Sequence, residues 1–225
     1  VAATGKPLIV VLQNGSALAV NWAAQNAKAI LEAWYPGEEG GTAIADTLAG
    51  ENNPAGRLPL TFYTGLDQLP PFTDYSMKNR TYKYFTGKPL FGFGYGLSYT
   101  TFRYSDLKGP SLVTAGQSAS IEATVTNSGS VAGDEVVELY LTQPHGFETP
   151  IRVLAGFTRV HLAPGESGVA HFQLSPRSLG QVDEQGNRVI LPGRYTVSVG
   201  GAQPGDFAEE QSGQFTVAGQ VELPQ

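Results

Sequence analysis

The sequence has 225 residues, of which 41% are hydrophobic and 15% are charged, and this composition is typical of a globular protein rather than a disordered one. Its 14 basic and 20 acidic residues give a formal net charge of −6 without any basic cluster, which excludes nucleic acid as a main partner. There is no cysteine and no run of about 18 apolar residues, which excludes disulfide bonds, zinc–thiolate sites and a membrane-spanning helix.

The first 34 residues alternate between strand and helix patterns. Residues 8–12 form a continuous apolar run, typical of a strand that is buried on both faces of a parallel sheet. A helix is predicted over residues 16–28, with alanine and valine on one face. A second apolar run at residues 29–34 predicts the next strand.

The next segment predicts a second helix. It starts after the turn at Pro36 and Gly37, carries Glu38 and Glu39 in its first turn, where carboxylates suit the positive end of the helix dipole, and stops at Gly50. Strand–helix–strand–helix order indicates a parallel sheet with helices on its faces. Two strands are too few for an independent sheet. We therefore expect further strands upstream, and the absence of an initial Met and of a signal peptide agrees with missing upstream residues.

Residues 50–107 are expected to be irregular, because they are rich in glycine, proline and aromatic residues. So long a loop inside a folded domain is unusual unless it is functional or packs on another part of the protein. Within it, Arg80 and Tyr82 are the candidate substrate-binding residues, since an arginine beside aromatic rings suits a sugar. The competing interpretation is a loop that is pinned against the neighbouring domain.

From about residue 109 the hydrophobic period changes to two. Ala119, Ile121, Ala123 and Val125 alternate with polar residues, and residues 136–141 repeat the pattern with Val137, Leu139 and Leu141 on one face and Val136, Glu138 and Tyr140 on the other. About seven short strands separated by turn signals predict a β-sandwich of the immunoglobulin or fibronectin type III kind. The residues after Ala218 are expected to fray.

The predicted fold is therefore α/β plus all-β. Residues 1–107 are the C-terminal part of a mainly parallel α/β sandwich domain with a long Gly/aromatic loop, residues 108–218 are a fibronectin-like β-sandwich, and residues 219–225 are a tail. The three histidines (His145, His161 and His171) have no metal-site spacing and are expected to be solvent-facing or satisfied. The adjacent carboxylates Glu38 and Glu39 cannot flank one bond, because neighbouring helix positions do not face each other.

Several blocks together resemble glycoside hydrolase family 3, the β-glucosidase and β-xylosidase family. Residues 33–48 resemble the family pattern A-W-x-P-G-x-x-G-G-x-A-I-A-D-x-L, and residues 53–62 resemble N-P-x-G-R-L-P-x-T-F. Further similarity is carried by residues 10–15, 82–85, 89–102, 133–140 and 154–157. The blocks cover nearly the whole chain in family order, so the resemblance is far more specific than any single motif.

The resemblance implies a retaining, exo-acting β-glycosidase without a cofactor or metal, acting on a β-linked oligosaccharide or glycoside. The nucleophilic Asp is expected on an N-terminal barrel and the acid/base Glu on a loop upstream of residue 8, so no catalytic residue is expected in this chain. The expected partner is the upstream catalytic part, and a homo-oligomer is left open. Export to the periplasm or outside the cell is expected for such an enzyme.

Two alternatives stay open at this stage. A sandwich also suits a non-catalytic carbohydrate-binding or structural module, although such a module does not need the parallel strands of the first 62 residues. A self-sufficient hydrolase would have to use carboxylates of this chain, such as Glu38, Asp46 or Asp74.

Overall fold

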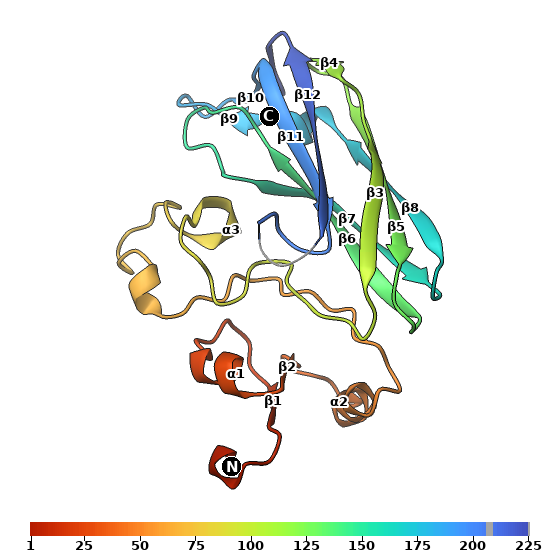
Figure 1. The fold of residues 1–225 in the computed structure, drawn as a ribbon. Helices are drawn as coiled ribbons and strands as arrows, with labels where there is room; N and C mark the ends of the chain where they lie inside the picture. The colour runs from red at the N-terminus through yellow and green to blue at the C-terminus, as the bar shows by residue number, and fades with distance from the viewer. Residues whose placement is uncertain (206–208, 225) are drawn as a thin grey trace.

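The alternating and continuous apolar runs fold into two parts joined by a long loop, as seen in a computed structural model that describes residues 1–205 and 209–224 (Figure 1). The helices are η1 (Ala2–Thr4), α1 (Asn21–Asn26), α2 (Gly40–Ala49), η2 (Leu66–Gln68), α3 (Thr81–Tyr84) and α4 (Pro176–Leu179). The strands are β1 (Ile9–Leu12), β2 (Ala29–Glu32), β3 (Phe102–Lys108), β4 (Leu112–Thr114), β5 (Ala119–Asn127), β6 (Gly133–Thr142), β7 (Val153–Leu162), β8 (Ser167–Leu174), β9 (Gln181–Val182), β10 (Arg188–Ile190), β11 (Gly193–Gly200), β12 (Glu210–Ala218) and β13 (Val221–Glu222). No helix among these is long and apolar enough to cross a membrane within the described ranges.

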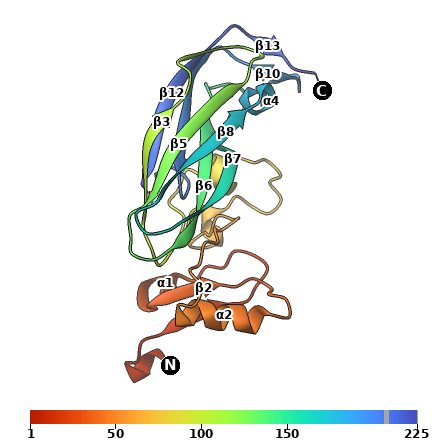
Figure 2. The same cartoon turned by 90° about the vertical axis from the view of Figure 1, so that its right-hand side faces the viewer.

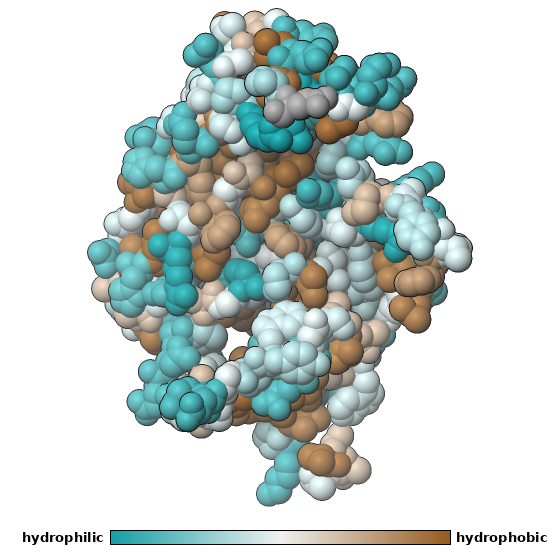
Figure 3. Space-filling model, turned by 180° about the vertical axis from the view of Figure 1, so that it is seen from behind, coloured by the Kyte–Doolittle hydropathy of each residue, from teal (hydrophilic) through white to brown (hydrophobic). Residues whose placement is uncertain are grey.

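The N-terminal part is the predicted βαβα unit. β1 and β2 pair in parallel from Ile9 opposite Ala29 to Leu12 opposite Glu32, and α1 lies between them in the chain. Neither strand is buried on both faces in this chain, and Ile9 is 48% exposed. Hydrophobic side chains therefore reach the surface in the lower part of the molecule, below the sandwich (Figure 3).

Both helices of this part are shorter than predicted. The helix expected over residues 16–28 covers only Asn21–Asn26. It ends there because Ala27 is already extended and the Lys28 N–H bonds the Leu8 carbonyl at 2.7 Å. Strand pairing thus takes over before the helix can continue.

The second helix begins after the two glutamates rather than with them. Glu39 is the residue before the first turn of α2, its side chain makes no capping bond, and the first turn contains no acidic residue. A Cβ at Gly40 would overlap Pro36, so the turn packs closely on the helix start. The predicted end is confirmed, since Gly50 adopts the left-handed conformation with φ 84°.

The C-terminal part is the predicted β-sandwich. One sheet has the order β4-β12-β11-β6-β7 and the other β3-β5-β8, and a small sheet β13-β10-β9 lies at one end (Figures 1 and 2). The period-two pattern of β5 is confirmed, because Ala119, Ile121, Ala123 and Val125 are all buried. They belong to a core that includes the stacked rings of Tyr195 and Phe215.

Two expectations about the ends of the sandwich are wrong. β3 starts at Phe102, inside the stretch expected to be irregular, and pairs with β5. Residues 221–223 do not fray, because β13 pairs with Val189 and Ile190 of β10 and the Leu223 N–H bonds the Arg188 carbonyl at 2.8 Å. Residue 225 lies outside the described range. The division of the chain at residue 107 stays a prediction, and we propose to place it between residues 101 and 102.

Candidate functional site: the aromatic loop on the sandwich

The long loop is built on a short pairing of two of its own segments. The Phe62 N–H bonds the Phe91 carbonyl at 2.9 Å, and the Leu90 N–H bonds the Phe62 carbonyl at 2.7 Å. Further along, the Leu58 N–H bonds the Tyr95 carbonyl, and the Gly94 N–H bonds the Leu58 carbonyl. Residues 58–62 therefore run beside residues 90–95, which keeps the intervening segment together at its base.

Aromatic rings connect this base to the α/β part. Phe62 is buried and lies edge-on to both Trp34 and Phe91, each with ring centroids 6.2 Å apart. Phe91 in turn stacks on Tyr95 at 5.2 Å. Such ring pairs are worth about 0.5–1.5 kcal/mol beyond the burial of area, so the loop is fixed to Trp34 just after β2.

A buried ion pair joins the loop to the sandwich. The Arg57 Nη2 lies 2.6 Å from Glu135 Oε2 of β6, and the two side chains are only 9% and 4% exposed. Arg57 Nε also donates to the Gly201 carbonyl at 2.9 Å. Tyr104 of β3 donates its hydroxyl hydrogen to the other oxygen of Glu135. Burial raises the pKa of Glu135, and the Arg57 cation opposes this rise.

A second buried carboxylate lies beneath the glycine-rich end of the loop. Glu138 accepts a hydrogen bond from the Tyr140 hydroxyl at 2.6 Å, and burial raises the pKa of its carboxyl group. Gly94 adopts φ 79°, and a Cβ there would overlap the Glu138 carboxylate. The loop backbone thus approaches β6 so closely that only glycine fits.

Arg80 holds the backbone of the exposed segment before it. Its guanidinium donates to the Asp74 carbonyl at 2.6 Å, to the Ser76 carbonyl at 3.1 Å and to the Pro71 carbonyl at 3.2 Å. The segment that it holds carries Phe72 and Tyr75, which are 93% and 90% exposed. The geometry gives Arg80 a positioning role, while a direct contact between Arg80 and a sugar stays a prediction.

Tyr82 pins α3 to the sandwich. Its ring stacks on Phe93 with centroids 4.2 Å apart, and its hydroxyl oxygen accepts a hydrogen bond from the Leu154 N–H of β7 at 3.1 Å. Next to it, the Ile151 N–H bonds the Lys83 carbonyl at 2.7 Å. Burial raises the pKa of Tyr82. Within the described residues, no hydrogen bond joins the side chains of Arg80 and Tyr82. Direct sugar binding by Tyr82 also stays a prediction.

Polar groups gather where the parallel strands end. Glu32, the last residue of β2, accepts a hydrogen bond from the Trp34 N–H at 3.1 Å, and Trp34 has a positive φ of 52°. Burial raises the pKa of Glu32, while Trp34 and Asn14 oppose the rise. Glu32 Oε2 and Asn14 Oδ1 are both buried, and neither atom has a hydrogen-bond partner among the described residues. In open α/β sheets ligands bind outside the carboxyl ends of strands, which is where these groups lie.

The carboxylates considered for a self-sufficient hydrolase lie on separate segments. Glu38 precedes α2, Asp46 lies on its exposed side, and Asp74 lies in the segment held by Arg80. The Ser76 N–H lowers the pKa of Asp74, which suits an ionised loop residue rather than a general acid.

The expectation that the histidines are solvent-facing or satisfied is confirmed for all three, because His145 is exposed as well. His161 contacts Asp134 and His171 contacts Glu122, both with exposed rings. No group of three potential metal ligands occurs within residues 1–205 and 209–224.

Sequence reasoning missed the buried carboxylates Glu135 and Glu138. A signal was present, because Glu135 and Glu138 fall on opposite faces of a strand that is otherwise apolar from residue 136 to residue 141, which indicates that both faces meet polar partners. The partner Arg57 lies 78 residues away, and its identity needed the tertiary structure.

Comparison with known proteins covers both parts of the chain. Residues 1–99 match the model of the glycosyl hydrolase family 3 C-terminal domain, and residues 135–203 match that of the fibronectin type III-like domain. The xylan 1,4-beta-xylosidase of Xylanibacter ruminicola is 42% identical over 88% of this chain, which spans 23% of that relative. The periplasmic beta-glucosidase of Salmonella typhimurium is 39% identical over 88% of the chain, which spans 28% of it.

Solved structures show the same likeness. The beta-glucosidase from Listeria innocua in complex with glucose aligns over 97% of this chain with a TM-score of 0.84 and 30% identity, and the chain covers 32% of it. The beta-D-glucoside glucohydrolase of Trichoderma reesei aligns over 96% with a TM-score of 0.85 and 28% identity, and 34% of it is covered. The chain therefore spans between about a quarter and a third of these proteins.

Proposed function

Because the chain belongs to glycoside hydrolase family 3, as a C-terminal portion of such a protein, we propose that it is part of a retaining, exo-acting β-glycosidase. The proposed reaction is hydrolysis of terminal β-D-glucosyl or β-D-xylosyl residues. The names of the two relatives, a beta-xylosidase and a beta-glucosidase, support this substrate class. The chain would join an upstream catalytic part that supplies the nucleophile and the acid/base residue.

The observation that carries the proposal is the incomplete α/β part. The parallel pair β1–β2 is its only sheet within the described residues, and apolar side chains such as Ile9 and Trp22 are about half exposed. Parallel sheets are normally covered on both faces. An upstream segment that adds strands and covers both faces of the sheet would bury these side chains. The greater length of the relatives supports such a segment.

Retention needs two carboxyl groups about 5–5.5 Å apart, one forming a glycosyl–enzyme and the other first protonating the leaving oxygen and then activating water. In the proposed assignment both groups lie upstream, and the present chain contributes the wall around the carboxyl ends of β1 and β2 together with the aromatic loop. The sandwich then holds this wall in place through Arg57 and Tyr82.

The test is an assay of the homogeneous 225-residue chain with aryl β-glucoside and aryl β-xyloside. We expect no turnover by the chain alone and recovery of turnover on addition of the separately produced upstream part, because each part lacks groups that the other supplies. An intact mass measurement shows that no upstream fragment co-purifies. Turnover by the chain alone would contradict the proposal and would direct attention to Glu38, Asp46 and Asp74.

The exposed segment held by Arg80 is proposed to line the leaving-group side of the sugar cleft in the longer protein. Tyr75→Ala should raise KM for a disaccharide about tenfold, which corresponds to about 1.4 kcal/mol. Arg80→Ala should have a similar effect, since the segment loses its three carbonyl contacts. The matched control is Val169→Ala, an exposed apolar residue on β8. Unchanged constants for the disaccharide and for an aryl glycoside would refute this role.

A homo-oligomer and export stay predictions.

A further inference from the structure

We propose that a cavity at the far end of the sandwich binds one ring of a neutral saccharide, as a site separate from the proposed catalytic cleft. The cavity has a volume of about 240 Å³ and lies between the loop before β7 and the β9–β10 hairpin. That hairpin lies at the opposite end of the molecule from α1, β1, β2 and α2 (Figures 1 and 2).

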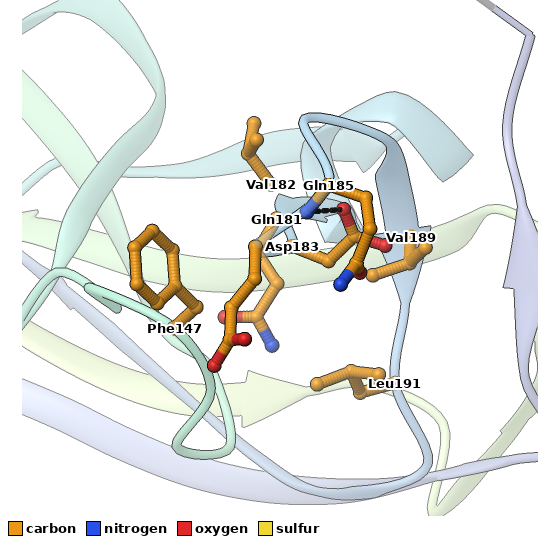
Figure 4. Close-up of a pocket in the computed structure, with 8 residues that line it drawn as sticks. Phe147, Gln181, Val182, Asp183, Gln185, Val189 and Leu191 are labelled. Carbon is orange, nitrogen blue, oxygen red and sulfur yellow. Dashed lines mark hydrogen bonds between the residues drawn. The ribbon is translucent and has the colours of Figure 1, made fainter.

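The walls of the cavity combine an aromatic ring with polar groups. In Figure 4 the ring of Phe147 stands on one side, Asp183 and Gln185 on the other, and Leu191 below. Phe147 is 50% exposed, so one part of its ring is available to a ligand. Glu184, on the turn of the hairpin, also lines the cavity.

The hairpin wall is fixed before any ligand arrives. Asp183 Oδ1 accepts hydrogen bonds from the Gln185 N–H at 3.0 Å and the Asn187 N–H at 2.8 Å, and Gly186 at φ 85° completes the turn. The described hydrogen bonds of the Asp183 side chain use only Oδ1, so the second carboxylate oxygen remains available as an acceptor.

The aromatic wall is tied to the same hairpin. Thr149 bonds both the Gly146 N–H, at 2.6 Å, and Gln181 Oε1 of β9, at 2.8 Å, while Gln181 also bonds the Pro144 carbonyl at 3.3 Å. These contacts bracket Phe147 on both sides. A ligand therefore meets two walls that need little ordering on binding, which reduces the entropic cost.

The chemistry of the lining selects the ligand. Aromatic and apolar side chains suit the C–H face of a pyranose, and the carboxylates of Asp183 and Glu184 accept hydrogen bonds from sugar hydroxyls. No lysine or arginine lines the cavity, so an anionic saccharide would meet only negative charge. The volume lies just below the range of about 300–1,000 Å³ for drug-sized ligands, which points to one ring of a chain and not to a whole oligosaccharide.

This site needs neither catalytic carboxylate, so the 225-residue chain tests it without the upstream part. Xylohexaose, cellohexaose and a galacturonate hexamer are titrated into the chain, and binding is followed by calorimetry and by chemical shifts of labelled phenylalanine. We expect at least one neutral hexamer to bind and the galacturonate hexamer not to bind. Failure of this result would leave the proposed hydrolase function intact, since that function is tested by turnover.

Variants locate the binding. Phe147→Ala should weaken it at least tenfold, and Glu184→Gln should weaken it about threefold, because a charged acceptor bonds more strongly than a neutral one. The matched control is Phe157→Ala on β7, an exposed phenylalanine outside the cavity. Unchanged melting temperatures show that the variants fold. Equal binding by Phe147→Ala and the wild-type chain, or no binding of either neutral hexamer at millimolar concentration, would overturn the proposal.

Discussion

Replacing Arg57 with alanine is expected to destabilise the folded chain by about 3–5 kcal/mol, the usual cost of leaving one partner of a buried ion pair without its counter-charge. Glu135 would keep only the Tyr104 hydroxyl as a side-chain partner, and its carboxylate is 4% exposed. Urea unfolding followed by near-ultraviolet circular dichroism measures the change, since buried tyrosines report on this part of the sandwich.

The matched control is Arg159→Ala, which removes an exposed pair with Asp134. The Arg159 side chain is 64% exposed, so its loss should cost less than about 1 kcal/mol. If Arg57→Ala and Arg159→Ala lower the free energy of unfolding equally, then the buried ion pair stabilises the fold no more than the exposed one.

The pH dependence separates a charge effect from lost packing. Burial raises the folded-state pKa of Glu135 above its unfolded value, so the folded chain binds this proton more tightly, and stability falls as the pH rises through the folded pKa. Removal of the Arg57 cation raises that pKa further. The penalty of Arg57→Ala should therefore shrink at acid pH, where Glu135 is protonated, and be largest at neutral pH. A penalty that does not change with pH would indicate lost contacts alone.

Replacing Gly94 with alanine is expected to cost about 3 kcal/mol. Its φ of 79° is strained for any residue with a Cβ, which accounts for about 1–2 kcal/mol. The new methyl group would also displace the Glu138 carboxylate and break its bond with the Tyr140 hydroxyl, a buried contact worth about 1–3 kcal/mol.

Gly165 offers the control for backbone strain alone. It has the same φ of 79°, but a Cβ there would meet nothing within 4 Å. Gly165→Ala should therefore cost only about 1–2 kcal/mol. If the two glycine variants lose equal stability by urea unfolding, then the close approach of the loop to β6 does not contribute.

The sequence by itself determined the class and order of the main elements. Alternation at residues 119–125 gave the buried face of β5, and the continuous run at 8–12 gave β1, because these signals depend only on the period of the side chains along the strand. Gly50 likewise marked the end of α2, since its left-handed conformation is a local requirement. The ordered blocks at residues 33–48 and 53–62 indicate the family without any knowledge of the fold.

The candidate site was only partly predictable. The sequence singled out Arg80 and Tyr82 as unusual, and the structure shows what each side chain contacts: backbone carbonyls for Arg80, and Phe93 and the Leu154 N–H for Tyr82. These partners lie between 4 and 72 residues away along the chain. No local pattern encodes them.

Tertiary structure alone decided which surfaces are covered. The period of β6 predicts one apolar face, yet Glu138 and Tyr140 on its other face are also buried, because Gly94 approaches Glu138 and Tyr82 packs edge-on against Tyr140. The helix expected over residues 16–28 ends early for a similar reason, because Lys28 pairs with Leu8. Period and propensity act over a few neighbouring residues, whereas burial depends on which distant segment arrives at a surface, and that is settled only when the whole chain packs.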